Sequence, residues 1–172
     1  MGDLRGVKRN TWEGGHRVPF IASWPARIQP GSISTETVCH VDMIATCADL
    51  TRFQLPNEAA EDSVSIVPAL LGEKRDHPLR EATVHHGADG TLAIRKDHWV
   101  FINAKSTGGD EPDWFKKQRG YVPDAFPGQL YDLDQDPSER HNLYGQHPEI
   151  VKDLKALLAK YQQDGRSVPV RR

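Results

Sequence analysis

A dense group of charged side chains surrounds a glycine pair near the start of the chain, in the stretch GVKRNTWEGGHRVP. Lys8 carries a compact ammonium that suits a point contact to an anionic oxygen, and Arg17 offers a planar fork for a carboxylate or oxoanion. Gly14 and Gly15 permit the close backbone approach that an anion-binding turn needs. Alternatively, Glu13 pairs with Arg17 and the charges only fix the loop, since charged clusters are usually solvated or self-paired. The residue types alone leave both interpretations open.

His85 and His86 form a second candidate site. Adjacent residues of a strand point to opposite faces, and no third ligand is evident, so we expect no metal ion at this pair and predict no metal ligands in the chain. One interpretation is that a histidine of this pair contacts a substrate. The other is that both are strand-end residues with local hydrogen bonds.

Aromatic side chains gather in a polar stretch over residues 104–127 that we expect to be a long loop. They either line a substrate cleft, because sugar faces stack on aromatic rings, or anchor the loop to a sheet. The residues are Trp114, Phe115, Tyr121 and Phe126.

The composition excludes some classes of partner. The chain has 172 residues, enough for one domain or a large domain fragment, and its 37% apolar and 27% charged residues fit a globular protein. Lysine and arginine total 22 against 24 acidic residues, so the net charge of -2 gives no whole-chain attraction to nucleic acid or to an anionic membrane. We therefore predict neither partner. The opening MGDLRGVKRN has no apolar core typical of a secretory signal, and the localisation stays open.

The two cysteines, Cys39 and Cys47, lie eight residues apart. On a helix that spacing corresponds to about 12 Å along the axis, too far for a disulfide. We expect two buried free thiols.

The first half of the chain alternates short apolar runs with turns. Pro19–Trp24 is expected to be a short buried strand that Pro25 ends. A helix is predicted to begin near Asp42, and a short helix over Ile66–Leu71 is stopped by Gly72. The apolar side of the first helix is predicted to carry Ile44, Cys47, Ala48 and Leu50.

From residue 82 onward the pattern becomes β-rich. The runs ATVHH, TLAIRKD and HWVFINA and the start of QLYDLDQDPSERHNL predict antiparallel strands, with the alternation in TLAIRKD suggesting a half-buried strand. Apolar residues at helical spacing, with Pro148 at the start and Gly165 after the end, predict an amphipathic helix over 148–164. This order of elements favours α+β architecture for the second half.

Taken together, these pieces resemble the sulfatase family of the alkaline-phosphatase superfamily. The family pattern has a lysine, a spacer, an aromatic residue, Glu-Gly-Gly-x-Arg-x-Pro, an apolar strand, Trp-Pro, Pro-Gly and an Asp-initiated helix. The chain supplies these residues in order, and DSVSIVPALLGE, LAIRKDHWVFI and LYDLDQDPSERHNL are also similar to the family. The matching residues are Lys8, Trp12, Glu13, Gly14, Gly15, Arg17, Pro19, Trp24, Pro25, Pro30, Gly31 and Asp42.

The resemblance implies an α/β to α+β fold. Residues 1–75 would be the incomplete end of the catalytic α/β domain with the last part of its central sheet. Residues 76–172 would form a C-terminal subdomain, a small antiparallel sheet packed with the helix 148–164. The resemblance also implies that Lys8 contacts the substrate sulfate, that Arg17, His85 and His86 are substrate-binding candidates, and that a structural motif is formed by Glu13, Gly14, Gly15 and Pro19.

Sulfatases use a formylglycine made within Cys/Ser-x-Pro-x-Arg and a calcium-type ion, so that a hydrated aldehyde attacks sulfur while cationic groups stabilise the sulfuryl oxygens. Neither Cys39 nor Cys47 is followed by x-Pro-x-Arg, and no Asp-Asp or Asp-Asn pair precedes Lys8. We therefore predict no cofactor in this chain, no activity in isolation, and a sulfate-ester substrate only when the chain is joined to an N-terminal catalytic part. The alternative is a stand-alone, non-catalytic binding module. The oligomeric state is not predicted.

Overall fold

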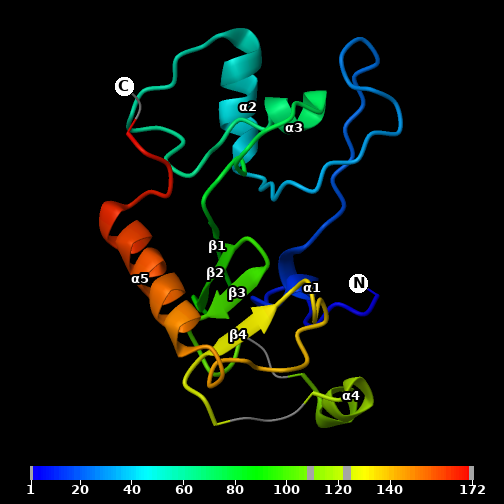
Figure 1. Ribbon diagram of the computed structural model, residues 1–172, viewed down its shortest axis with the longest axis vertical. Helices are drawn as coiled ribbons and strands as arrows, with labels where there is room; N and C mark the ends of the chain where they lie inside the picture. Colours follow the sequence, from blue (N-terminus) through cyan, green and yellow to red (C-terminus); the bar gives the residue numbers. More distant parts are fainter. Residues whose placement is uncertain (1, 108–110, 122–124, 171–172) are drawn as a thin grey trace. The chain divides into compact units, whose positions relative to one another are not determined.

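The computed structural model describes residues 2–107, 111–121 and 125–170 (Figure 1). Two compact units are present. The first combines the N-terminal segment through Val18 with Val84–Lys160, and the second combines Pro19–Thr83 with the segment that begins at Tyr161.

Four strands form one sheet in the order β1-β2-β3-β4, so that each strand lies beside the next one in sequence. β2 and β3 pair antiparallel with Arg95 opposite Val100, and β3 and β4 pair antiparallel with Val100 opposite Tyr131. Asp97 adopts a left-handed φ of 54° in the turn between β2 and β3. The strands are β1 (Thr83–His86), β2 (Leu92–Lys96), β3 (Trp99–Ile102) and β4 (Gln129–Asp132).

The core of the first unit lies on both faces of this sheet. Ala93 and Ile94 are neighbours on β2 and point to opposite faces, yet neither side chain is exposed. The expectation of a half-buried strand is therefore wrong at this point, because protein covers both sides of the sheet. One face packs against Trp12 in a buried apolar cluster completed by Ala93, Val100, Ile102, Tyr131 and Leu133.

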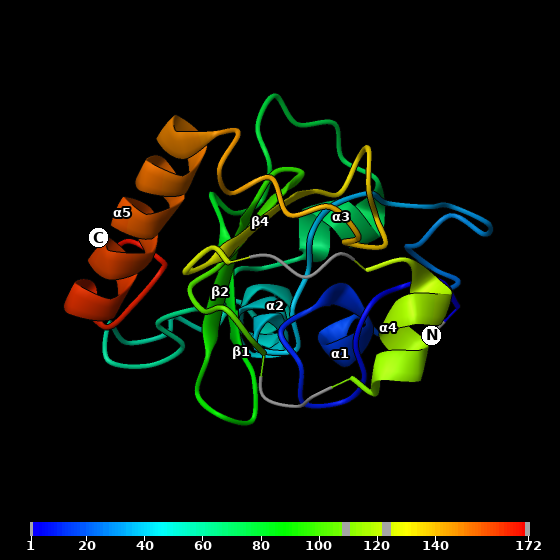
Figure 2. The same cartoon turned by 90° about the horizontal axis from the view of Figure 1, so that it is seen from below.

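The C-terminal helix α5 spans Pro148–Asp164, the bounds that the sequence predicted. Its buried side chains recur at helical spacing at Val151, Leu154 and Leu158, which gives the helix one apolar face. The part through Lys160 runs alongside the sheet in both views (Figures 1 and 2).

A further helix, α4 (Asp113–Arg119), lies inside the stretch that we expected to be a loop, and that expectation is wrong for these residues. Asp113 lies in its first turn, three basic residues lie in its last turn, and Gly120 ends it with a φ of 72°. Phe115 packs edge-on against Tyr121, whereas Trp114 is mostly exposed. Residues 108–110 and 122–124 of the predicted loop lie outside the described residues.

The second unit contains α2 (Asp42–Thr51) and α3 (Val67–Leu71). Asp42 is fully buried at the start of α2, where its carboxylate accepts hydrogen bonds from the Cys39 and Val64 amides and pairs with Arg80. This is the position at which the sequence predicted the helix to begin. The α3 helix ends at Gly72 as expected.

The predicted apolar side of α2 is wrong for Ile44, Cys47 and Leu50, which are exposed, whereas Ala48 is buried as predicted. The buried residues are Asp42, Thr46 and Ala48, because the polar side chains of the first two bond to neighbouring backbone. The large apolar side chains face solvent instead, among them Ile44 and Leu50. The cysteines differ from expectation as well, since Cys47 is exposed and Cys39 is half-buried before the helix begins.

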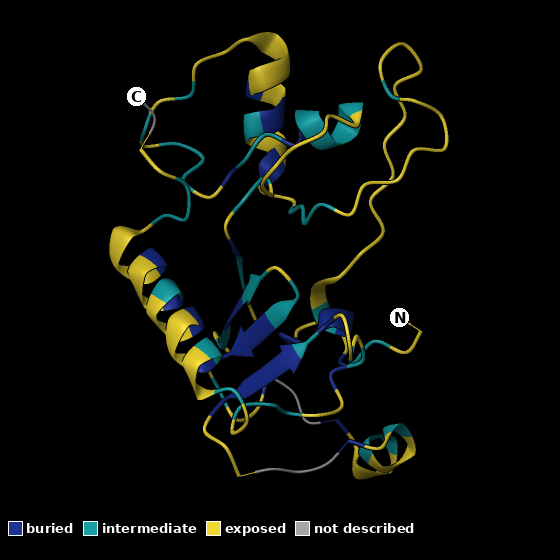
Figure 3. Ribbon diagram, viewed as in Figure 1, coloured by how far each residue is buried: buried dark blue, intermediate teal, exposed yellow. Residues whose placement is uncertain are grey.

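Pro19–Trp24 is irregular and exposed, so the predicted buried strand is not formed (Figure 3). Ile21 is 90% exposed. Among the described residues no strand lies beside this segment, and a single strand cannot satisfy its backbone hydrogen bonds without a neighbour.

Candidate functional site

Lys8 lies at the tip of a tight turn that Asn10 holds together. The Asn10 amide donates to the Val7 carbonyl at 3.0 Å, and the Val7 amide donates to Asn10 Oδ1 at 2.8 Å. Asn10 Nδ2 donates to the Thr107 carbonyl at 2.6 Å, which ties the turn to the chain beyond β3. Asn10 is buried and Lys8 is exposed. The Lys8 ammonium makes no hydrogen bond or ion pair with the residues that the structure describes, so it is available to an anion.

Helix α1 (Glu13–His16) contacts this turn closely enough to require two glycines. The Gly14 amide donates to the Arg5 carbonyl at 2.7 Å, and a Cβ at position 14 would lie 2.5 Å from the same oxygen. A Cβ at position 15 would lie 2.2 Å from the Asn10 carbonyl oxygen. Any side chain at either position would therefore push α1 away from the turn.

Glu13 is a buried carboxylate, 1% exposed, surrounded by cationic and imidazole groups. Its Oε2 accepts from Arg17 Nη1 at 3.1 Å, and Arg95 Nη1 on β2 lies 3.8 Å from the same oxygen. His16 Nε2 lies 3.8 Å from Oε1. Such pairing compensates the cost of burying the charge and holds α1 to the sheet.

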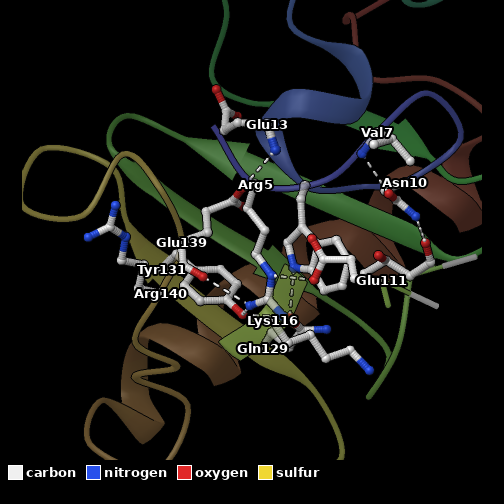
Figure 4. Close-up of polar contacts among 12 residues, drawn as sticks. Arg5, Val7, Asn10, Glu13, Glu111, Lys116, Gln129, Tyr131, Glu139 and Arg140 are labelled. Atoms are coloured by element: carbon white, nitrogen blue, oxygen red, sulfur yellow. Dashed lines mark hydrogen bonds and ion pairs between the residues drawn. The ribbon is translucent and has the colours of Figure 1, made fainter. Parts of the chain in front are cut away.

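Arg5 is the centre of a second network, which no sequence pattern predicted. Its guanidinium lies between the rings of Trp12 and Tyr121, 4.0 and 4.1 Å from their centroids. It also donates to Glu111 Oε2, to the Tyr131 hydroxyl and to the Glu139 carbonyl (Figure 4). Stacking and hydrogen bonding by one planar group thus join the N-terminal segment, α4 and β4.

Glu139 connects the two networks. It is fully buried, and its Oε2 accepts a 2.7 Å hydrogen bond from the Glu13 amide. Burial, and to a lesser extent the nearby Glu13 charge, raise the pKa of Glu139 well above its usual value. The segment after β4 therefore supplies the partner for the N-terminal end of α1.

The rings of His16 and His85 are in contact, with their centroids 3.8 Å apart and their planes tilted by 41°. His85 Nε2 lies 2.9 Å from the Thr11 carbonyl, so this nitrogen carries the proton and Nδ1 is left as an acceptor. Burial first, and then the nearby Arg95 and Arg17, lower the pKa of His16 to about 4. Burial first, and then His16, lower the pKa of His85 to about 4, so both rings are neutral at pH 7. His16 was not among the expected site residues.

The turn between β1 and β2 lies directly against the Lys8 turn. The Ala88 amide donates to the Arg9 carbonyl at 2.9 Å, and a Cβ at Gly87 would lie 3.0 Å from that oxygen. His86 is exposed just before it, with Nδ1 3.0 Å from the Gly87 carbonyl. The structure therefore brings the histidine pair and Lys8 onto adjoining segments.

The other expected site residues are distributed differently. Arg17 is engaged with Glu13, and Pro19 is exposed at the start of the second unit. Among the expected aromatic residues, Phe115 and Tyr121 anchor α4 through Arg5, and Phe126 stacks on Tyr144. Trp114 extends into solvent and makes an edge contact with Phe115.

The residues of this chain do not fit a calcium site or a formylglycine motif. Within residues 2–107, 111–121 and 125–170, His, Cys, Asp and Glu side chains form no group of three that could hold a metal ion. Neither Cys39 nor Cys47 has the flanking proline and arginine of a formylglycine motif. The same part of the chain contains no helix with the length and apolar character needed to span a membrane.

Comparison with known proteins identifies the relatives of the chain. It is 40% identical over 158 residues to an N-acetylgalactosamine-6-O-sulfatase of Bacteroides thetaiotaomicron, a match that covers 92% of this chain and 30% of the relative. It is 33% identical over 175 residues to human arylsulfatase A, covering 95% of this chain and 34% of that protein. The chain thus spans about a third of the length of these relatives. No protein-family model matches it.

Solved structures agree with these relatives. A structure from work on glycosaminoglycan metabolism by Bacteroides thetaiotaomicron superposes with a TM-score of 0.76 at 37% identity, over 95% of this chain and 32% of that one. A sulfatase of Pseudoalteromonas sp. shares the fold at a TM-score of 0.70 and 20% identity, over 98% and 34% of the two chains. The sheet with its helices thus has the α+β fold of this class of hydrolases. The chain is a homologue of the sulfatases and matches a C-terminal portion of them.

Proposed function

We propose that this chain acts as the C-terminal part of a sulfate-ester hydrolase and that Lys8 contributes the ammonium that contacts the substrate sulfate. The observation that carries the proposal is the exposed, unpaired Lys8 on a turn held by the buried Asn10 and by the contact with Gly15. A fixed point charge stabilises the negative charge that develops on the sulfuryl and leaving-group oxygens.

Glu13, Gly14 and Gly15 then hold the Lys8 turn in place. We assign Arg17 to the same structural role because its guanidinium is paired with Glu13. Pro19 continues this structural motif. In the same proposal, residues 1–75 are the end of a catalytic domain and residues 76–172 are its C-terminal subdomain.

His85 and His86 are proposed to contact the organic part of the substrate. A neutral imidazole hydrogen-bonds a hydroxyl without requiring a second charge, and His85 keeps Nδ1 as an acceptor. The Bacteroides relative acts, by its name, on an N-acetylgalactosamine 6-O-sulfate. We therefore propose a carbohydrate sulfate as the substrate class.

The remaining catalytic groups are proposed to come from an N-terminal catalytic part, on the same or a separate polypeptide. Exposed large apolar side chains in the second unit support this, since extensive exposed apolar surface is often covered by another protein part. The residues are Phe20, Ile21, Trp24, Ile33, Val41, Met43, Ile44, Leu50 and Phe53.

The test is hydrolysis of an aryl sulfate, with and without calcium. We expect no turnover by the purified chain alone, and turnover when it is produced together with the N-terminal two-thirds of the Bacteroides relative. Lys8→Ala should reduce the rate of the combined enzyme by about 100-fold or more, as for loss of a charge-stabilising donor. Lys74→Ala, at an exposed lysine of the second unit, should leave it unchanged.

Turnover by the chain alone that depends on Lys8 would contradict the need for an N-terminal part. The alternative function, a stand-alone binding module, is favoured by the continuous buried core around the sheet of the first unit. Binding of a sulfated sugar by the chain, without any complementation of activity, would support that alternative.

A further inference from the structure

Arg9 has the most unusual backbone conformation among the described non-glycine residues. Its φ is 99°, whereas the other positive values, at Arg52, Ala60, Asp97 and Glu139, lie between 52° and 57°. The latter fall in the left-handed helical region that L-residues sometimes adopt, but the value at Arg9 lies well outside it. Strain of this kind is commonest at functional sites, and it persists only where the surrounding structure imposes it.

The neighbouring segments impose the conformation from both sides. The Arg9 carbonyl accepts a 2.9 Å hydrogen bond from Ala88 in the turn between β1 and β2. On the other side, Asn10 closes the turn through its amide and its Oδ1, both bonded to Val7. Glycine would adopt this φ without a steric cost, so folding gives no reason for an arginine here.

The Arg9 side chain is exposed, and it makes no hydrogen bond, ion pair or ring contact with any residue that the structure describes. The nearby arginines differ in this respect: Arg5 is bonded to Glu111, and Arg17 and Arg95 lie against Glu13. Lys8 and Arg9 are thus two adjacent cationic side chains that no acidic group of the described residues neutralises.

We propose that Arg9 binds a second anionic group of the substrate, a carboxylate or a second sulfate, beside the sulfate that Lys8 contacts. This inference rests on the function proposed above and narrows its substrate class to glycans with at least two anionic groups close together. A guanidinium suits this role because its planar fork matches carboxylate and sulfate oxygens.

The test measures binding of three sugars to the chain by nuclear magnetic resonance titration of its backbone amides. The first sugar is N-acetylgalactosamine 6-sulfate, the second is its 4,6-disulfate, and the third is a disaccharide that joins the 6-sulfate to a uronic acid. The second and third sugars distinguish a second sulfate from a carboxylate.

For Arg9→Gly we expect two effects of opposite sign. Affinity for one or both of the doubly charged sugars should fall about 3- to 10-fold, while affinity for the monosulfate changes less than about twofold. The melting temperature should rise by about 2–5 °C, because the backbone strain is relieved. A residue with only a structural role would not link weaker binding to higher stability.

Arg52→Gly is the matched control, since Arg52 is another exposed arginine with a positive φ and lies in the second unit. It removes the same charge and should leave all three affinities unchanged. The proposal is overturned if Arg9→Gly and Arg52→Gly bind the three sugars equally, or if the wild-type chain binds neither doubly charged sugar more tightly than the monosulfate.

Lys8→Ala separates this inference from the proposed function. Loss of binding to all three sugars in Lys8→Ala, with unchanged binding in Arg9→Gly, would leave the role of Lys8 standing and overturn that of Arg9. Selective weakening in Arg9→Gly, with no effect of Lys8→Ala, would support the Arg9 contact and contradict the role of Lys8.

Discussion

At the scale of single residues, the candidate site depends on charges whose partners are fixed and on rings that are kept neutral. Glu13 is buried beside Arg17 and Arg95, while the rings of His16 and His85 are in contact next to them. A positive charge on the His16 ring would be repelled by Arg95 and Arg17, and one on the more buried His85 ring would be repelled by His16 and Arg95. The structure therefore stabilises two neutral imidazoles next to a cluster of permanent cations.

This arrangement predicts a loss of stability in mild acid. The pKa values of His16 and His85 fall from 6.5 to about 4 on folding, so between these values the unfolded chain binds more protons than the folded chain. The stabilisation that comes from keeping these two rings neutral should therefore be complete above pH 6.5. As the pH falls towards 4, the free energy of unfolding should decrease. Because 31% of the His16 side chain is exposed, solvent weakens its interactions. We therefore expect the two histidines together to account for a decrease of about 2 kcal/mol in the free energy of unfolding.

Urea unfolding at pH 7.5, 6.5, 5.5 and 4.5 measures this effect in the wild type and in His16→Gln/His85→Gln. Glutamine can donate to the Thr11 carbonyl without titrating, so the double variant should lose less stability with acid. Glu139 acts in the opposite direction because its pKa is raised, but it is present in both proteins and cancels in the difference. His141→Gln, at an exposed histidine, is the control. Parallel pH profiles for wild type and double variant would refute the prediction.

At the scale of elements, the functional candidates depend on how α1 meets the turn that carries Lys8. The helix has only four residues and could not persist alone. It is held by the Trp12 indole, which donates to Gln129 on β4, by Glu139, and by the close backbone contact at Gly14 and Gly15. The Glu-Gly-Gly sequence thus places a charged helix directly against the Lys8 turn.

Gly15→Ala should break this contact. A Cβ there would overlap the Asn10 carbonyl, so we expect a loss of about 2–4 kcal/mol in the free energy of unfolding, or loss of a cooperative transition. Gly31→Ala is a suitable comparison because a Cβ there meets nothing within 4 Å and only the positive φ is penalised, at about 1 kcal/mol. Thermal and urea unfolding would measure both variants. Equal free energies of unfolding for Gly15→Ala and Gly31→Ala would contradict the proposal that close packing at Gly15 holds the Lys8 turn in place.

The elements that sequence predicted correctly are those whose signal is local. Helix 148–164 and the β runs after residue 82 have a clear period, and the structure contains them. Pro19–Trp24 has a strand-like composition, but a strand forms only beside a partner, which composition cannot reveal. The α4 helix was missed because its signals, Asp113 at the start and basic residues before Gly120, lie within a polar segment that lacks an apolar period.

In the candidate site, too, sequence could predict only those features whose signal is local. The Lys8 turn and the Glu-Gly-Gly motif are contiguous and could be recognised in the sequence. The ring contact between His16 and His85, and the Arg5 network with Glu111 and Tyr131, join residues far apart in the chain. Only the fold brings such side chains together, and no local pattern marks Arg5 as a central residue.

At the scale of the whole molecule, the two units differ in how well they bury apolar side chains. The first unit has a continuous core on both faces of its sheet. In the second unit the polar side of α2 is inside, and the apolar side chains of residues 20–53 are largely outside (Figure 3). A surface of this kind favours association, either with a further part of a sulfatase or with itself.

This difference predicts a specific effect of charge on α2. Ile44→Lys/Leu50→Lys should reduce self-association of the purified chain, measured by sedimentation velocity, with little change in thermal stability, because both side chains are already exposed. The same variant should no longer restore sulfatase activity with the N-terminal part of the Bacteroides relative, since two charges would be buried in the new contact. Ala156→Lys, on the exposed side of α5, is a control that should retain complementation. Full activity of the doubly charged α2 variant would show that this face remains uncovered in the active enzyme, and would contradict the proposal that an N-terminal part covers it.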